Sequence, residues 1–121
     1  SIVRGTTSKK IVEMVPDAGA TEVHFRIASP PTTHSCFYGV DTPNKEDLLA
    51  HRMNLSGMRA FIQADSLAFI SMDGLYRAVG EAKRLSGAPQ FCEACFSGQY
   101  PVEPTHAREF RRQLSFLAEV V

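Results

Sequence analysis

The sequence predicts an α/β fold, because segments with the periodicity of strands alternate with segments that carry helix signals. Residues 22–27 alternate apolar and polar side chains, which is typical of a strand with one polar face. Residues 67–71 form a short and almost wholly apolar run, as expected of a strand buried on both faces of a parallel sheet.

The composition is that of one soluble globular domain. The chain has 121 residues, of which 13 are basic and 13 acidic, 44% are hydrophobic and none is tryptophan. The balanced charge removes any global electrostatic case for nucleic-acid binding, which requires an excess of Lys and Arg. No run approaches the roughly 18 apolar residues of a membrane span, and the first residues lack a signal-peptide pattern. We therefore expect a cytoplasmic protein with neither a nucleic-acid nor a membrane partner.

At the start of the chain, a loop over residues 1–8 rich in Gly, Thr and Ser leads into a helix over residues 9–15. The helix carries three apolar residues on one face: Ile11, Val12 and Val15. Pro16 is expected to kink or end this helix, and Gly19 to complete its exit. A parallel α/β unit normally begins with a strand, whereas this sequence opens on the loop that should follow one. A preceding strand is therefore expected outside the sequence.

Three helices are expected in the middle of the chain. Thr42 is the predicted N-cap of the first, which runs to about residue 53, and the second follows Asn54. The predicted buried stripe of the second helix consists of Leu55, Met58, Phe61 and Ile62. Asp73 is the predicted cap of the third helix, which carries Leu75 and Val79 and which Gly80 ends.

Residues 81–104 have the composition of a loop, and an amphipathic helix is expected at the end of the chain. Its apolar positions recur at spacings of four, three and four residues: Phe110, Leu114, Leu117 and Val121. This division suggests a first part over residues 1–80 and an extension over residues 81–121 that holds a CxxC loop and the tail helix.

The segment Arg4-Gly5-Thr6-Thr7-Ser8 has the residue types of a phosphate-binding loop. Glycine lets backbone N–H groups approach an anion, hydroxyl groups add donors, and the N-terminus of a helix adds a favourable dipole. Lys9 and Lys10 would raise the local positive potential. The alternative interpretation is an ordinary helix start, with Thr6 or Thr7 as the N-cap and no ligand.

Three cysteines are an odd number, which fits a secreted disulfide framework poorly. Cys92 and Cys95 form a CxxC pair that can offer two thiolates to one metal, and Cys36 reaches it only through the fold. One alternative is zinc held by the three cysteines with His34 or His106. Another is an iron-sulfur cluster completed by a cysteine from elsewhere, and a third is a set of ordinary thiols.

The N-terminal segment closely resembles the second half of the phosphoribosyl-diphosphate signature of amidophosphoribosyltransferases, which follows a strand ending in two aspartates. Later segments resemble the same family in the same order: Ser29-Pro30-Pro31, Cys36-Phe37-Tyr38-Gly39-Val40-Asp41-Thr42-Pro43, Ala64-Asp65-Ser66-Leu67 and Cys92-Glu93-Ala94-Cys95-Phe96-Ser97-Gly98. The resemblance covers about residues 1–101. It implies the C-terminal part of a type I phosphoribosyltransferase fold, with a helical and loop-rich C-terminal extension.

By this resemblance, the chain is part of an enzyme that converts phosphoribosyl diphosphate and glutamine to 5-phosphoribosylamine, glutamate and pyrophosphate. Arg4, Gly5, Thr6 and Thr7 would hold the 5-phosphate. The two aspartates that hold the ribose and assist magnesium would precede Ser1, and glutamine would bind a missing N-terminal domain. The complete enzyme is expected to form a homo-oligomer, while the fragment alone is expected to be inactive and to contain no catalytic residue.

The same resemblance assigns Cys36, Cys92 and Cys95 as ligands of a structural 4Fe-4S cluster, present in one subgroup of the family. The fourth ligand is expected outside this chain. The competing interpretation is a small non-enzymatic zinc-binding or interaction domain that uses the same three cysteines.

Overall fold

The computed structural model describes residues 1–104, so the expected tail helix lies outside the described residues. Its elements, in chain order, are α1 (Thr6–Asp17), β1 (His24–Ile27), the 3-10 turn η1 (Lys45–Asp47), α2 (Leu49–Arg52), α3 (Leu55–Ile62), β2 (Ser66–Phe69), α4 (Met72–Ala78) and α5 (Ala94–Ser97). None of the helices in residues 1–104 has the length and apolar character needed to cross a membrane.

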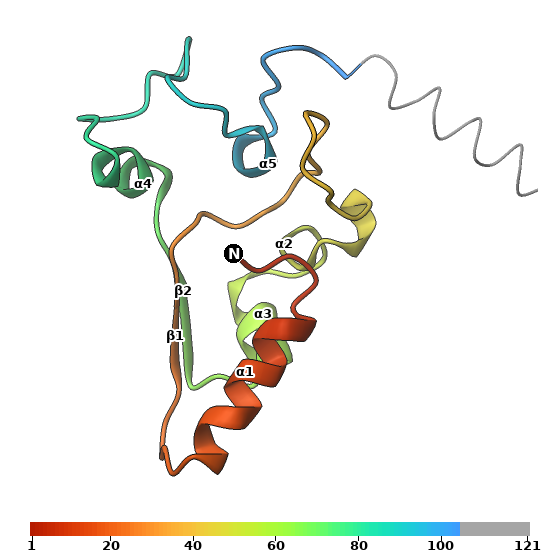
Figure 1. Cartoon of the computed structure of the whole chain (residues 1–121), viewed down its shortest axis with the longest axis vertical. Helices are drawn as coiled ribbons and strands as arrows, with labels where there is room; N and C mark the ends of the chain where they lie inside the picture. Colours follow the sequence, from red (N-terminus) through yellow and green to blue (C-terminus); the bar gives the residue numbers. More distant parts are fainter. Residues whose placement is uncertain (105–121) are drawn as a thin grey trace, which may run out of the picture.

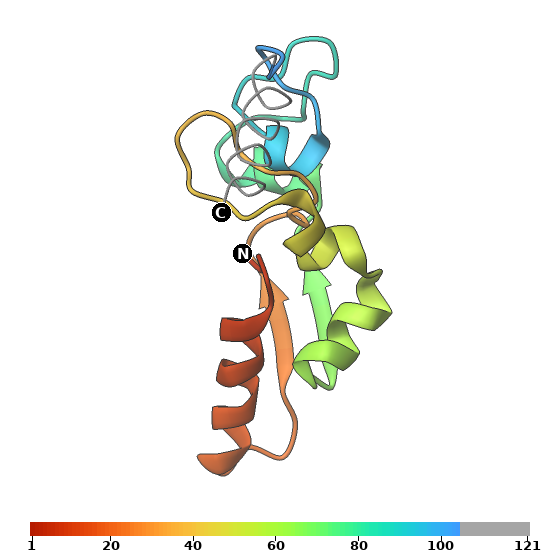
Figure 2. The ribbon, with the colours of Figure 1, turned by 90° about the vertical axis from the view of Figure 1, so that its right-hand side faces the viewer.

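A two-stranded parallel sheet organises the described part of the chain, which confirms the α/β class. Strands β1 and β2 are joined by a crossover that contains α2 and α3, as parallel neighbours require. Helices α1 and α3 contact each other and lie side by side on one face of the sheet (Figures 1 and 2). Helices α4 and α5 lie beyond the upper end of the sheet in Figure 1, where β2 leads into α4.

The two faces of the sheet differ in chemistry, as the alternating pattern of residues 22–27 predicts. Phe25 pairs with Leu67 and contributes to the apolar side, where both Leu67 and Ile27 are buried. On the other side, the Ser66 hydroxyl lies 2.8 Å from His24 Nδ1 and accepts a 2.9 Å hydrogen bond from Arg26. The strand with one polar face is therefore present, although it is shorter than expected.

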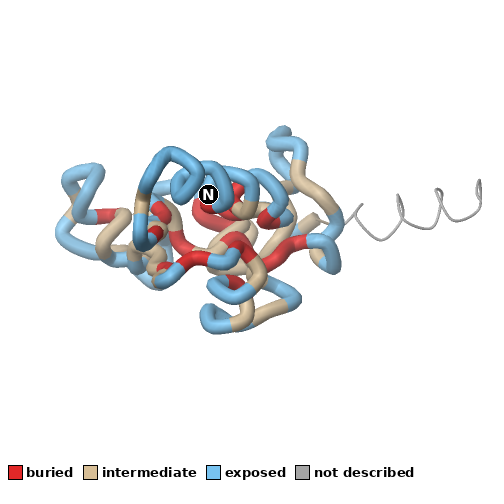
Figure 3. The backbone as a smooth tube through the Cα atoms, turned by 90° about the horizontal axis from the view of Figure 1, so that it is seen from below, coloured by how far each residue is buried: buried red, intermediate tan, exposed pale blue. Residues whose placement is uncertain are grey.

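The hydrophobic core lies between the sheet and the helices, and the exposed loops surround it (Figure 3). Ile2, Leu49 and Ile62 are at most 1% exposed, which places the N-terminal segment in the same core as α2 and α3. Met58 completes the buried side of α3, whereas Leu55 is 49% exposed. The predicted stripe of α3 is therefore confirmed at Met58 and Ile62, whereas Phe61 is only partly buried and Leu55 is exposed.

Helix α1 differs from its prediction at both ends. It begins at Thr6, with Gly5 as its N-cap, and continues one residue beyond Pro16. A proline in the last turn removes one hydrogen bond, and the Ala18 N–H still donates to the Met14 carbonyl at 3.3 Å. Of the three apolar residues on the predicted face, only Val12 is buried.

Side-chain caps in the middle of the chain only partly follow the predictions. Helix α3 follows Asn54, as expected, and Asn54 caps it by accepting a 2.8 Å hydrogen bond from the Gly57 N–H. Thr42 caps no helix, because its hydroxyl accepts from the Cys36 N–H at 2.9 Å. The cap of α4 is Ser71 rather than Asp73, because the Ser71 oxygen is the one that reaches the free Gly74 N–H.

The core position of Ile62 yields a stability prediction. Ile62→Ala should lower the free energy of unfolding by about 2–5 kcal/mol, because it leaves a cavity at a fully buried site. Leu55→Ala, on the same helix but half-exposed, should cost less than about 1 kcal/mol. Urea unfolding followed by circular dichroism measures both values, and equal losses would contradict this description of the core.

Candidate functional site

The loop before α1 turns at Gly5, which packs closely against α2 and α3. Gly5 has φ of +86°, a left-handed conformation that glycine adopts without steric cost. It is buried, and a Cβ placed on it would lie 2.7 Å from Leu49 Cδ2 and 2.9 Å from Phe61 Cε1. The backbone therefore turns at Gly5 because α2 and α3 pack against it too closely for any side chain.

The turn at Gly5 presents the N-terminus of α1 to solvent. Thr6 and Thr7 are exposed in the first turn of the helix, whose N–H groups have no acceptor within the helix. No side chain caps this end, so neither Thr6 nor Thr7 has the capping role that the alternative interpretation gave them. Together with the exposed Arg4, the helix dipole and these donors form an arrangement that can hold an anion.

Leu49 and Phe61 support this loop, and the sequence analysis did not predict that role for either residue. The Leu49 N–H donates a 2.8 Å hydrogen bond to the Val3 carbonyl and so fixes the residues before Gly5. Phe61 packs below Gly5, and the Lys9 ammonium lies 5.7 Å from the centre of the same ring. Leu49 and Phe61 look like ordinary core residues in the sequence, and no motif links them to residues 3–9.

The second group of candidate residues lies where the segment around Cys36 meets α5. The N–H groups of Thr33 and His34 both donate to the Cys95 carbonyl at 3.0 Å. The Cys36 thiol accepts a 3.4 Å hydrogen bond from the Tyr38 N–H. Two segments that are about 60 residues apart in the sequence are thus joined directly beside two of the three cysteines.

The pKa of Cys95 depends on its burial and on the other two cysteines. Burial is the main reason why the pKa of Cys95 is raised, and negative charge on Cys36 or Cys92 raises it further. The pKa of the Tyr100 hydroxyl is also raised, first by burial and then by Cys95. The Tyr100 hydroxyl donates a 2.7 Å hydrogen bond to the Ser35 carbonyl, next to Cys36.

The three thiols fit the donor set of an iron-sulfur cluster, since all are free cysteines on two connected segments. Within residues 1–104, however, no three His, Cys, Asp or Glu side chains are gathered closely enough to hold a metal ion. The ligand roles of Cys36, Cys92 and Cys95 therefore remain predictions. His34, one of the alternative zinc ligands, packs against Gly98, and burial lowers its pKa; His106 lies outside the described residues.

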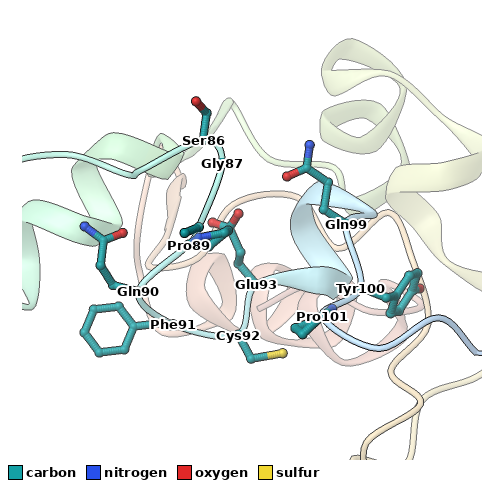
Figure 4. A pocket seen from close by; sticks show the side chains of 11 residues that line it. Ser86, Gly87, Pro89, Gln90, Phe91, Cys92, Glu93, Gln99, Tyr100 and Pro101 are labelled. Carbon is teal, nitrogen blue, oxygen red and sulfur yellow. The ribbon is translucent and has the colours of Figure 1, made fainter.

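Beside Cys92, the loop over residues 86–93, together with residues 99–101, lines an open pocket of about 470 Å³ (Figure 4). Cys92 and Glu93 point to opposite sides of this loop, with the Glu93 carboxylate directed away from the Cys92 sulfur. Glu93 is buried and pairs with Arg84, a contact that the sequence gave no signal for. In the sequence, this buried residue stands between the two cysteines of the CxxC pair.

Sequence comparison finds close relatives along most of the chain. It is 55% identical over 104 residues to the chloroplastic amidophosphoribosyltransferase of Vigna aconitifolia, a match that covers 86% of this chain and 20% of that protein. It is 49% identical over 121 residues to the amidophosphoribosyltransferase of Rhizobium etli, covering 98% of this chain and 24% of the relative. The chain thus spans about a fifth of the length of these relatives. No family model matches it.

Solved structures agree with the sequence comparison. The glutamine phosphoribosylpyrophosphate (PRPP) amidotransferase from B. subtilis, complexed with ADP and GMP, is 48% identical to this chain with a TM-score of 0.78. The match covers 88% of this chain and 23% of that one. A second structure, described as the allosteric regulatory enzyme of purine biosynthesis, is also 48% identical, with a TM-score of 0.77.

The comparisons correct the expected location. The sequence showed no targeting pattern and predicted a cytoplasmic protein, but the relatives from Vigna aconitifolia, Glycine max and Arabidopsis thaliana are named as chloroplastic proteins. The first residues of this chain could not establish the location, because the chain matches only about a fifth of the length of these relatives.

The close packing at Gly5 can be tested with a matched pair of glycines. Gly5→Ala should lower the free energy of unfolding by about 2–4 kcal/mol, because left-handed strain is added to a clash with Leu49 and Phe61. Gly19→Ala should cost only about 1–2 kcal/mol, since Gly19 has φ of +108° but nothing within 4 Å of the added Cβ. Chemical denaturation compares the two variants. Equal losses would show that the contact at Gly5 is unimportant.

Proposed function

The chain is a segment of an amidophosphoribosyltransferase, and from this premise we propose that it supplies the loop that holds the 5-phosphate of phosphoribosyl diphosphate. The observation that carries the proposal is the buried left-handed Gly5, which presents the first turn of α1 and the exposed Thr6 and Thr7 to solvent. The complete enzyme would convert phosphoribosyl diphosphate and glutamine to 5-phosphoribosylamine, glutamate and pyrophosphate, in purine biosynthesis.

The proposed fold context is the C-terminal part of a type I phosphoribosyltransferase domain over residues 1–80, followed by an extension over residues 81–121. The parallel pair of β1 and β2 with α1 and α3 on one face supports this assignment. A strand that ends in two aspartates would precede Ser1. The binding site for glutamine, and contacts between subunits of a homo-oligomer, would be formed outside the residues described above.

In the proposed mechanism, the chain holds one end of the substrate while the reaction occurs at the other. Ammonia from glutamine forms a bond to the anomeric carbon of the ribose, and the bond from that carbon to pyrophosphate breaks. Positive charge develops on the sugar, so the rate depends on fixing the sugar relative to the nucleophile and the leaving group. Amide and hydroxyl donors at Gly5, Thr6 and Thr7, with the charge of Arg4, would fix the phosphate end.

Magnesium, when bound, would neutralise charge on the leaving pyrophosphate. The carboxylates expected to assist it are those of the preceding strand, so residues 4–7 act on the phosphate alone. For this reason we expect no phosphoribosylamine formation by the 121-residue chain by itself.

We also assign Cys36, Cys92 and Cys95 to three ligand positions of a structural 4Fe-4S cluster in the complete enzyme, with the fourth cysteine elsewhere in the subunit. The cluster would supply a covalent crosslink between the extension and the rest of the subunit. Two features support the assignment: the hydrogen bonds that join residues 33–34 to Cys95, and the contribution of Cys36 and Cys92 to the raised pKa of Cys95.

The phosphate role predicts a selective effect on substrate affinity. In the full-length enzyme, Thr7→Val should raise the KM for phosphoribosyl diphosphate by about tenfold or more, because a hydroxyl bonded to a charged phosphate contributes about 1.5–3 kcal/mol. Steady-state kinetics should show an unchanged KM for glutamine. Thr21→Val, at another exposed threonine, serves as the control. An unchanged KM for phosphoribosyl diphosphate in Thr7→Val would argue against the phosphate site.

The cluster assignment predicts the metal content of the full-length enzyme purified without oxygen. The protein should contain iron and sulfide, and Cys36→Ser or Cys95→Ser should remove most of both, because each replaces a soft thiolate ligand. Ser86→Ala, on the exposed loop before the CxxC pair, should keep the wild-type content. A colourless protein that contains zinc instead would overturn the assignment.

A further inference from the structure

Glu93 combines an unusual position with unusual burial. It is the first residue between Cys92 and Cys95, yet its side chain is only 4% exposed. Charged side chains are rarely buried to this degree without a partner, and Glu93 has one in Arg84, whose Nε donates to Oε1 of the carboxylate. Arg84 also donates from Nη2 to the side chain of Gln99, which follows α5 in the sequence.

The second oxygen of the Glu93 carboxylate is buried, and the carboxylate affects Tyr76 of α4. Tyr76 of α4 is 1% exposed and its ring packs against Phe91, with 5.7 Å between the ring centroids. Within residues 1–104, neither Glu93 Oε2 nor the buried Tyr76 hydroxyl has a partner at normal hydrogen-bond geometry. Burial raises the pKa of Tyr76, and the Glu93 carboxylate raises it further.

The backbone of Glu93 contacts α5, while its side chain pairs with Arg84. Its carbonyl accepts hydrogen bonds from the N–H groups of Phe96 and Ser97, both at 2.9 Å. The orientation of α5, and with it the direction of Cys95, therefore depends on where Glu93 lies. Since Cys92 points to the opposite side of the loop from the Glu93 carboxylate, an inward Glu93 keeps Cys92 outward (Figure 4).

We propose that Glu93, held by Arg84, is a positioning residue that sets the directions of Cys92 and Cys95 relative to Cys36. The proposal rests on the cluster assigned above, because positioning the cysteines serves that cluster. The contacts that position them are all formed by residues of this chain. Breaking a buried ion pair on one side leaves an unpaired charge and releases the loop, so either partner can be tested.

The experiment uses the full-length enzyme with Glu93→Gln, Arg84→Met and Arg84→Lys, and Glu103→Gln as the control at an exposed glutamate. Iron and sulfide are measured first in protein purified without oxygen. The metal is then removed with a chelator, and alkylation of each cysteine by iodoacetamide is followed by mass spectrometry. Glu93→Gln and Arg84→Met should each lose most of the iron, and the partly buried Cys95 should react about tenfold faster, because a charge-assisted hydrogen bond no longer opposes local opening.

Four results decide the matter. Support requires that Cys36 keeps its wild-type reaction rate while Cys95 reacts faster, and that Arg84→Lys keeps both the iron content and the protection of Cys95. Equal acceleration at all three cysteines would reduce Glu93 to a general stabiliser and overturn the proposal, as would wild-type iron and alkylation in Glu93→Gln. If the wild-type enzyme contains no iron, the cluster assignment fails, and the alkylation rates alone still decide the role of Glu93.

Discussion

The close packing of Gly5 against Leu49 and Phe61 is the constraint on which the candidate phosphate site depends. No residue with a side chain fits at this point, so the chain passes close to α2 and α3 and then turns into α1 with its first amides exposed. The buried Ile2 and the hydrogen bond from Leu49 to Val3 fix the approach to the turn. The same core that stabilises the fold therefore shapes the site, and a loss of packing there would affect both.

A second centre follows a different logic. The loops around Cys36, Cys92 and Cys95 have little regular structure, so backbone bonds to Cys95, the Tyr100 hydroxyl and the buried Glu93–Arg84 pair hold them in place. In the amidophosphoribosyltransferase we propose, a cluster would lock segments that already lie together. The protein would thereby combine a packed phosphate loop with a loop region whose order depends on polar contacts and a metal group.

Local patterns in the sequence predicted much of the fold. The alternation in residues 22–27 predicted β1, the apolar run after Asp65 predicted β2, and the helix after Asn54 is α3. The errors arose where several side chains compete for one backbone group. Thr42 bonds to Cys36 instead of capping a helix, and Ser71 takes the place of Asp73. Such choices depend on residues that are distant in the sequence or offset by one or two positions.

The candidate site was predictable to the extent that it is contiguous. Residues 4–7 form one motif, whereas Leu49, Phe61, Arg84 and Glu93 reach their sites only through tertiary packing. The most direct test of the account is a crystal structure of the full-length enzyme with ribose 5-phosphate. We expect the phosphate to lie within hydrogen-bond distance of the Thr6 and Thr7 amides, with Gly5 still left-handed. A phosphate bound away from residues 4–7 would contradict the account.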